Sequence, residues 1–259
     1  MEGLFWLSEE QLERIKPFFP KSRGVSRVED RKVLSGIIYV QRHGLRWVDA
    51  PAAYGLYKTL YNRCRRWSEK GIFQLIFSEL SRSAGTEPAA GAEPEKVLMV
   101  DATYVKAHPT ACSLKKGGAA PRLIGGTKGG LTSKLHVVCD GKGRPVRPHL
   151  SPGQCSDFTG ADVLLQDLPE ARVLIGDKGY DSNKIRSRLL GQGITPCIPS
   201  RRNRNKKVPY SRRLYKMRHK VENLFAKLKD WRRIATRYDR CAHIFYSAVL
   251  LAATLIFWL

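Results

Sequence analysis

The sequence predicts an α/β protein, in which an all-helical domain precedes a domain built on a mixed sheet. Apolar residues recur at helical spacing through the first 80 residues. The stretch 83–95 (SAGTEPAAGAEPE) lacks aromatic and long aliphatic residues and is typical of a linker. From Lys96 onward, short runs rich in β-branched residues lie between Gly and Asp clusters. We therefore expect a helical domain at 1–82, a linker at 83–95 and a sheet domain at 96–259.

Two capping patterns place the first helices. Ser8 with Gln11, and Ser26 with Glu29, each match the arrangement in which a hydroxyl and a side chain three residues later cap a helix reciprocally. Apolar residues at helical spacing follow both pairs. A third helix is predicted to begin near Leu56.

Basic and polar side chains cover one arc of this third helix at about 100° per residue. They are Lys58, Thr59, Asn62, Arg63, Arg65 and Arg66. The opposite arc, which we expect to pack, holds Leu56, Tyr57, Leu60, Tyr61, Cys64 and Trp67. Helices joined by a turn, with a basic outer face, resemble a helix-turn-helix domain that reads DNA. An ordinary arginine-rich surface helix explains the pattern equally well. The expected DNA contacts are Lys58, Asn62, Arg63, Arg65 and Arg66.

Two carboxylates stand at predicted strands of the sheet domain. Asp101 interrupts the apolar run VLMVDATYV, where an ionised side chain is costly unless it meets a cation or donors. Asp177 ends a second run, VLIGDKGYDS, at the carboxyl end of a strand, where open α/β sheets place their ligands. Asp181 follows closely and is predicted to form a turn or cap a helix.

A third carboxylate lies on a predicted helix near the C-terminus. Tyr215, Arg218, Glu222 and Lys229 fall within an arc of roughly 60° if the segment is one α-helix. The opposite side, expected to be buried, holds Val221, Leu224 and Leu228. An exposed salt-bridged face would explain Arg218 and Glu222 but not the tyrosine and distant lysine on the same line. Three carboxylates gathered from two strands and a helix would repel one another unless Mg²⁺ lay between them.

The charge of the chain indicates an anionic partner. Lys and Arg number 46 against 23 Asp and Glu, a formal net charge of +23. Such an excess favours nucleic acid or an acidic membrane surface. The apolar segment Ile244–Leu259 falls short of the ~20 residues that span a bilayer, so we expect a buried core helix and no membrane contact. The scattered cysteines predict a reduced protein without a zinc site.

Taken together, these motifs resemble a bacterial insertion-sequence transposase of the DDE type, in the insertion sequence 5 family of the insertion sequence 4 superfamily. The matching segments are GLFWLSEEQLERIKPFFP, HGLRWVDAP, MVDATYVKAH, GGTKGGLTSKLHVVCDGKGRP, IGDKGYDS, CIPSRRNR and YKMRHKVENLFAKLKDWRRIATRYDRCAH. The last contains the superfamily signature of Tyr, Arg, Glu and Lys at Tyr215, Arg218, Glu222 and Lys229.

The resemblance implies a ribonuclease-H-like catalytic domain in which Asp101, Asp177 and Glu222 bind metal. The expected metal is Mg²⁺, for which Mn²⁺ can substitute. Tyr215, Arg218 and Lys229 are implied to contact DNA, and His219 beside Arg218 is expected to touch phosphate. The implied reaction cuts phosphodiester bonds at terminal inverted repeats and joins the 3′-hydroxyl ends to target DNA.

The implied partner is double-stranded DNA, both element ends and target, bound by a homodimer or higher oligomer in the bacterial cytoplasm, at the nucleoid. One stretch departs from the family pattern, because Pro148 stands in an expected strand and cannot donate to a sheet ladder. An edge strand or a frayed strand is expected there. Two other classes of protein remain as alternatives: a non-catalytic DNA-binding regulator derived from a transposase, and a basic protein anchored to a membrane by residues 244–259.

Overall fold

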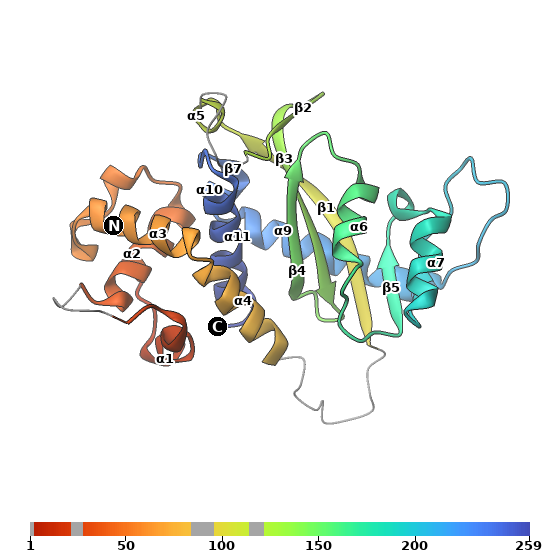
Figure 1. The fold of residues 1–259 in the computed structure, drawn as a ribbon, viewed down its shortest axis with the longest axis horizontal. Coiled ribbons are helices and arrows are strands. Elements are labelled where there is room, and N and C mark those ends of the chain that lie inside the picture. Colours follow the sequence, from red (N-terminus) through yellow and green to blue (C-terminus); the bar gives the residue numbers. More distant parts are fainter. Residues whose placement is uncertain (1–2, 22–27, 84–95, 114–121) are drawn as a thin grey trace. The chain divides into compact units, whose positions relative to one another are not determined.

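The computed structural model describes residues 3–21, 28–83, 96–113 and 122–259, and its contacts divide the chain into two compact units (Figure 1). Unit 1 comprises Met1–Ala84, His108–Arg122 and Leu228–Leu259, and unit 2 comprises Gly85–Ala107 and Leu123–Lys227. The contiguous division at 1–82 and 96–259 expected from the sequence differs from this one, because the C-terminal segment is grouped with the N-terminal helices. Most of the predicted linker, 84–95, lies outside the described residues.

The first helices of unit 1 follow local capping rules. Helix α1 spans Glu9–Ile15, and the predicted capping box is confirmed by reciprocal bonds between Ser8 and Gln11. Helix α2 spans Asp30–His43 and ends at Gly44, whose φ of 74° is the left-handed conformation that favours glycine. Glu29 takes the N-cap position of α2 without a side-chain bond, and Ser26 lies outside the described residues.

Helix α3 spans Tyr57–Glu69, which confirms the predicted third helix, and α4 spans Ile72–Ser83. Three 3₁₀ turns connect this part of unit 1, at Lys16–Phe18, Trp47–Asp49 and Ala52–Tyr54. The remaining elements of the unit are α5 (Pro109–Cys112), α10 (Arg232–Ala235), β7 (Thr236–Arg237) and α11 (Ala242–Phe257).

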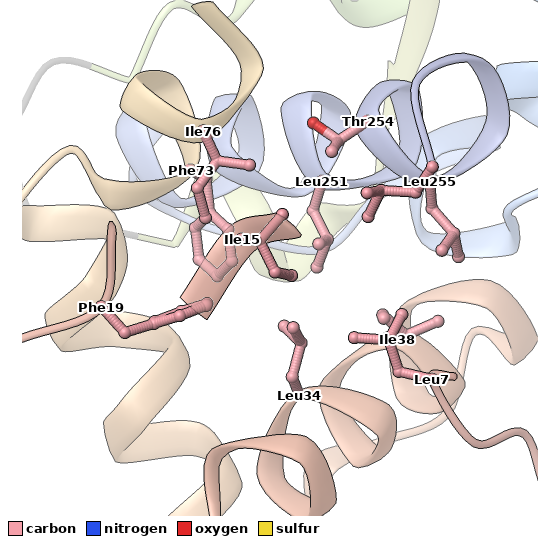
Figure 2. A pocket seen from close by; sticks show the side chains of 11 residues that line it. Leu7, Ile15, Phe19, Leu34, Ile38, Phe73, Ile76, Leu251, Thr254 and Leu255 are labelled. Carbon is pink, nitrogen blue, oxygen red and sulfur yellow. The ribbon is translucent and has the colours of Figure 1, made fainter. Parts of the chain in front are cut away.

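Helix α11 forms part of the core of unit 1. It packs against α3 and α4, and its residues Phe245 and Ala252 are fully buried. Figure 2 shows Leu251 and Leu255 of α11 facing Ile15, Leu34 and other apolar side chains around a small pocket. The expectation of a buried C-terminal core helix is confirmed. In the described part of the chain, none of the helices has the length and apolar character needed to cross a membrane.

Unit 2 is built on a mixed sheet with strand order β2-β3-β1-β5-β6, in which β4 also pairs with β3. The strands are β1 (Val97–Ala107), β2 (Gly125–Thr127), β3 (Gly130–Asp140), β4 (Pro145–Pro152), β5 (Val173–Gly176) and β6 (Thr195–Cys197). Strands β1, β5 and β6 run parallel, whereas β3 runs antiparallel to β1, β2 and β4. This arrangement confirms a mixed α/β fold.

Strand β4 forms despite its proline. Pro148 lies opposite Val137 of β3, and the register shifts between Val138 and Cys139. Among the described residues β4 pairs with β3 alone, so Pro148 needs no donor on the outer side. Pro148, which departs from the family pattern, therefore lies in an edge strand, one of the two outcomes expected.

The helical elements of unit 2 follow the strands closely. They are α6 (Asp157–Leu164), a 3₁₀ turn at Lys178–Tyr180, α7 (Asn183–Gly191), α8 (Arg212–Tyr215), a 3₁₀ turn at Lys216–Arg218 and α9 (His219–Lys229), whose last two residues are grouped with unit 1. Helix α6 crosses the sheet face formed by β3 and β4 (Figure 1). Val100, Leu174 and Leu189 belong to the buried cluster between strands and helices.

Candidate active site

Asp101 and Asp177 stand at adjacent positions of two parallel strands. The register pairs Val100 of β1 with Gly176 of β5, and each aspartate is the next residue along its chain. Burial raises the pKa of Asp101, the Arg218 guanidinium lowers it, and the negative charge of Asp177 adds to the rise. The parallel pairing thus places the two predicted carboxylates within electrostatic range of each other.

Asp177 is held by the turn that follows its strand. Its side chain caps the 3₁₀ turn Lys178–Tyr180 and accepts a 2.7 Å hydrogen bond from the Gly179 N–H. A Cβ on Gly179 would lie 2.7 Å from that same carboxylate oxygen, so any larger residue would displace it. The sequence Gly-Asp-Lys-Gly therefore fixes the carboxylate through both a backbone donor and the absence of a side chain.

Arg218 joins the other two predicted metal ligands. Its guanidinium donates to Asp101 Oδ2 at 2.7 Å and to Glu222 Oε1 at 2.6 Å. The Asp101 side chain is 13% exposed and that of Glu222 is 56% exposed, so the bridge runs from the sheet to an open helix face. The structure thus brings Asp101, Asp177, Arg218 and Glu222 together.

The predicted stripe of four residues is not on one regular α-helix. The 3₁₀ turn Lys216–Arg218 interrupts it, and the tighter winding of such a turn, about 120° per residue, rotates Tyr215 relative to the helix below. Tyr215 is half-buried against the ring of Tyr210, 5.4 Å away. Burial raises the pKa of the Tyr215 phenol, and the charges of Arg218 and Asp177 also act on it, so its side chain lies near the carboxylates.

The two remaining predicted DNA contacts of this segment, His219 and Lys229, differ in their surroundings. His219 is exposed, and its Nδ1 lies 2.7 Å from the carbonyl oxygen of Lys216. Lys229 ends α9 and is grouped with unit 1, and burial lowers the pKa of its ammonium. The predicted apolar side of the helix is confirmed, because Val221, Leu224 and Leu228 are all buried.

The donor chemistry of this cluster fits a hard divalent cation, since carboxylate oxygens are the ligands that Mg²⁺ prefers. As arranged here, however, no set of three acidic, histidine or cysteine side chains within the described residues is placed to hold a metal ion. Arg218 lies between Asp101 and Glu222 and supplies positive charge to both. A metal that used all three carboxylates would have to displace this guanidinium.

Two polar groups beside the cluster carry no individual sequence signal. Asp157, the first residue of α6, forms a 2.6 Å ion pair with Lys134, whose side chain is only 6% exposed. Burial raises the pKa of Tyr180 far above its ordinary value, and the charges of Asp157 and Asp101 add to the rise. Its buried hydroxyl has no hydrogen-bond partner within the described ranges. The Ser-Asp pair that opens α6 looks like an ordinary helix cap, so sequence alone does not distinguish Asp157.

The outer face of α3 requires one correction. Lys58, Asn62, Arg65 and Arg66 are exposed as expected. Arg63 is only 7% exposed: it pairs with Asp30 at 2.6 Å and donates to the Val28 carbonyl, so its placement on the outer face is wrong. Three residues assigned to the packing side are exposed instead, namely Leu56, Tyr57 and Tyr61.

Asp181 is also placed differently from the prediction. The N-cap of α7 is Ser182, whose hydroxyl accepts from Ile185 N–H. The Asp181 carboxylate is fully buried and accepts hydrogen bonds from Arg186 and Arg204, each at 2.9 Å. Its side chain is an ion-pair centre, because two guanidiniums converge on it, so the expected helix-cap role is wrong. The expected turn role is met by its backbone N–H, which donates to the Lys178 carbonyl and closes the Lys178–Tyr180 turn.

Two family models match the chain. Residues 92–257 match the family described as "Transposase DDE domain", and residues 7–77 match "Putative transposase of IS4/5 family". The "Putative transposase for insertion sequence element IS6501" of Brucella ovis is 36% identical over 130 residues, covering 50% of this chain and 99% of that protein. The "Transposase for insertion sequence element IS1106" of Neisseria meningitidis serogroup B is 27% identical over 184 residues, covering 69% and 62%.

A solved structure shares the fold. The piggyBac transposase in its synaptic complex with hairpin DNA superposes with a TM-score of 0.50 at 10% identity, covering 94% of this chain and 68% of that one. At this identity the likeness concerns the fold alone. The family matches extend over both the helical and the sheet-forming parts of the sequence. The chain therefore belongs to the transposase DDE-domain family, and it is a DDE-type transposase.

Proposed function

We propose that this transposase binds the terminal inverted repeats of its insertion sequence, cleaves phosphodiester bonds there and transfers the 3′-hydroxyl ends to target DNA. The observation that carries the proposal is the Arg218 bridge between Asp101 and Glu222, beside Asp177. Arg218 binds Asp101 and Glu222 and lies within electrostatic range of Asp177. These three carboxylates, from two strands and a helix, are the oxygen ligands that a metal-dependent phosphoryl transfer would use. The DNA substrate puts the activity at the nucleoid.

Asp101, Asp177 and Glu222 would hold two Mg²⁺ ions, or Mn²⁺ in their place, once Arg218 turns away. Bound there, the ions would activate the attacking oxygen and stabilise the leaving oxygen of the cut phosphodiester. A guanidinium released from two carboxylates is suited to bind a phosphate through paired hydrogen bonds. Arg218 would thus exchange the carboxylates for the DNA backbone as substrate and metal arrive.

Tyr215 and His219, in unit 2, and Lys229, at the end of α9, are proposed DNA contacts. The sheet of unit 2 is consistent with a ribonuclease-H-like catalytic domain, in which the strand ends present acidic residues. We propose that the N-terminal helices form a helix-turn-helix-like DNA-binding domain, with DNA contacts on α3 at Lys58, Asn62, Arg65 and Arg66. Arg63 is not included, because its guanidinium is buried against Asp30. We also propose a homodimer or higher oligomer on DNA, since two element ends must be processed.

The test is strand cleavage and joining with the purified full-length chain. Labelled duplexes carrying the two ends of the encoding element are incubated with Mg²⁺, with EDTA, and with the Glu222→Gln variant. We expect nicked and joined products only with the wild type and metal. Binding to the ends without any cleavage at any Mg²⁺ or Mn²⁺ concentration would instead favour the non-catalytic regulator.

A further inference from the structure

A strongly basic loop joins β6 to α8. This basic loop, residues 199–210, contains Arg201, Arg202, Arg204, Lys206 and Lys207. No Asp or Glu occurs anywhere from Ser182 to Val221, so the loop has no acidic neighbour along the chain. In Figure 1 it is part of the light-blue segment that extends beyond α7. Such a loop is expected to be mobile unless tertiary contacts hold it.

The buried Asp181 carboxylate holds the loop. One oxygen accepts from the side chains of Arg186 and Arg204, and the other accepts a 2.8 Å hydrogen bond from the backbone N–H of Arg201. Arg186 in turn donates to the carbonyl of Ile198 at 2.7 Å. Asp181 therefore holds the loop directly at Arg201 and Arg204, and it holds Ile198, just before the loop, through Arg186.

Further bonds close the loop on itself. The Lys207 ammonium donates to the carbonyls of Arg201 and Arg202, at 2.6 and 2.8 Å. Ser200 accepts a 2.9 Å hydrogen bond from the N–H of Val208 and so joins the two ends of the loop. Three of the five cations, Arg201, Arg204 and Lys207, are thus used to set its conformation.

Arg201 also connects the loop to the candidate active site. Its guanidinium donates to the carbonyls of Lys178 and Gly179, at 3.1 and 2.8 Å, and stacks 4.5 Å from the Phe158 ring. Lys178 and Gly179 form the turn whose N–H group holds the Asp177 carboxylate. The loop is therefore built against the turn that positions one of the three carboxylates.

The remaining cations point to a ligand. Arg202 and Lys206 are exposed, and their side chains make no hydrogen bond or ion pair with the described part of the chain. Arg212, Arg213 and Lys216, on the helical segment that follows, are exposed as well. Several exposed cations concentrated on one ordered loop and the helix that follows create a positive surface potential that attracts an anionic ligand. A regular array of phosphates supplies it most effectively.

We infer that the basic loop is a sequence-independent clamp for the phosphate backbone of duplex DNA, with Arg202 and Lys206 as its contacts. The inference rests on the proposed function and adds a DNA-binding surface in unit 2 that is separate from α3 and from the Tyr215, Arg218, His219 and Lys229 set. Either the element end or the target duplex could supply the phosphates. The chemistry of contact is the same in both cases.

The test measures binding as a function of salt for the full-length Arg202→Ala/Lys206→Ala variant. Two probes are used: a 30-bp duplex of arbitrary sequence, which represents target DNA, and a duplex with the terminal sequence of the encoding element. Each lost phosphate contact should reduce the slope of log affinity against log salt by about one, so we expect a reduction of about two. A reduction on both probes identifies a contact that any duplex can fill, and a reduction on the terminal duplex alone assigns the clamp to the element end.

Two matched variants separate the clamp from general charge effects. Lys128→Ala/Lys142→Ala removes two exposed cations from other turns of unit 2 and should leave the slope unchanged. Arg202→Lys/Lys206→Arg keeps the charge and should retain the wild-type slope. If the alanine pair in the loop keeps the wild-type slope on both probes while the wild type binds and cleaves, the clamp is refuted and the proposed function stands. A wild type that binds neither probe would instead contradict the proposed function itself.

Discussion

Arg218 donates a 2.7 Å hydrogen bond to Asp101, a residue 117 positions earlier in the chain, and the same guanidinium also binds Glu222. Burial by itself would favour the neutral form of Asp101 and raise its pKa, and the nearby guanidinium opposes that rise. The ion pair with Arg218 therefore offsets part of the cost of burying the Asp101 carboxylate before any metal or substrate is bound. Several consequences can be measured.

Neutralising the carboxylates should separate binding from chemistry. Asp101→Asn, Asp177→Asn and Glu222→Gln preserve shape, so folding and end binding should persist. Cleavage should fall by several orders of magnitude, because neutral amides are poor ligands for Mg²⁺. Strand cleavage at fixed Mg²⁺, with binding measured in parallel, checks this. Wild-type cleavage by the Asp177→Asn variant would show that the second metal ligand lies elsewhere.

Removing the bridging cation should expose the affinity of the carboxylates for metal. In Arg218→Gln, Asp101 and Glu222 lose their shared partner, so the melting temperature without metal should fall. Mg²⁺ should then raise it by more than in the wild type, since no guanidinium competes for the same oxygens. The double variant Arg218→Gln/Asp101→Asn should lose most of that gain. Equal Mg²⁺ responses in the wild type and Arg218→Gln would argue against a shared site.

The arginines of α3 should divide into two classes. Lys58→Ala/Arg65→Ala/Arg66→Ala removes exposed cations and should weaken DNA binding and flatten its salt dependence by up to about three, with little loss of stability. Arg63→Ala breaks the partly buried pair with Asp30 and should cost about 3–5 kcal/mol of unfolding free energy. Salt titrations and urea unfolding distinguish the classes. A destabilised triple variant with an unchanged slope would reverse the assignment.

Asp181→Asn should destabilise unit 2 at neutral pH. The change leaves Arg186 and Arg204 without their shared charge and should cost about 3–5 kcal/mol, whereas Ser182→Ala removes only a helix cap and should cost about 1 kcal/mol. Urea unfolding of the two variants provides the comparison. Equal costs would mean that the ion-pair centre contributes no more than a cap.

The same residue should make stability depend on pH. Burial acts to raise the pKa of Asp181, but the Arg201 N–H and the two guanidiniums lower it below the ordinary value. A carboxylate whose folded pKa is depressed stabilises the protein above its unfolded pKa of about 3.9, and that contribution disappears as the pH falls through the folded pKa. Acid unfolding of the wild type should therefore include a step below about pH 4 that Asp181→Asn lacks. Acid-unfolding curves of the same shape for the wild type and Asp181→Asn would contradict this prediction.

The C-terminal helix should behave as core. Phe245 is fully buried in α11, so Phe245→Ala should cost about 3–5 kcal/mol, whereas Leu75→Ala, on an exposed position of α4, should stay within about 0.5 kcal/mol. Deletion of Ile244–Leu259 should leave an insoluble chain. A soluble and active deletion variant would overturn the core assignment.

The sequence by itself determined much of the local structure and pointed to the candidate catalytic carboxylates. Capping at Ser8 depends on residues three apart, and β-branched runs identify strands whose ends carry Asp101 and Asp177. Because parallel strands align their carboxyl ends, the proximity of these two aspartates follows once the strands are recognised. The edge position of the strand containing Pro148 follows in the same way from the missing N–H group.

Only the tertiary structure decided which charged side chains are used for folding and which remain available. Helical periodicity placed Arg63 among the outward residues, but its partner Asp30 lies 33 positions earlier and reaches it only when α2 packs on α3. Asp181 looked like a turn residue because only one of its partners, Arg186, is near in sequence; Arg204 lies 23 positions later and reaches the carboxylate only after the chain has passed through α7 and β6. Helix α11 was recognisable as core, but its packing against α3 and α4 was not, since an apolar helix face carries no information about its partner. Such pairings depend on chain segments far apart in sequence, whereas periodicity reports only on neighbours within a few turns.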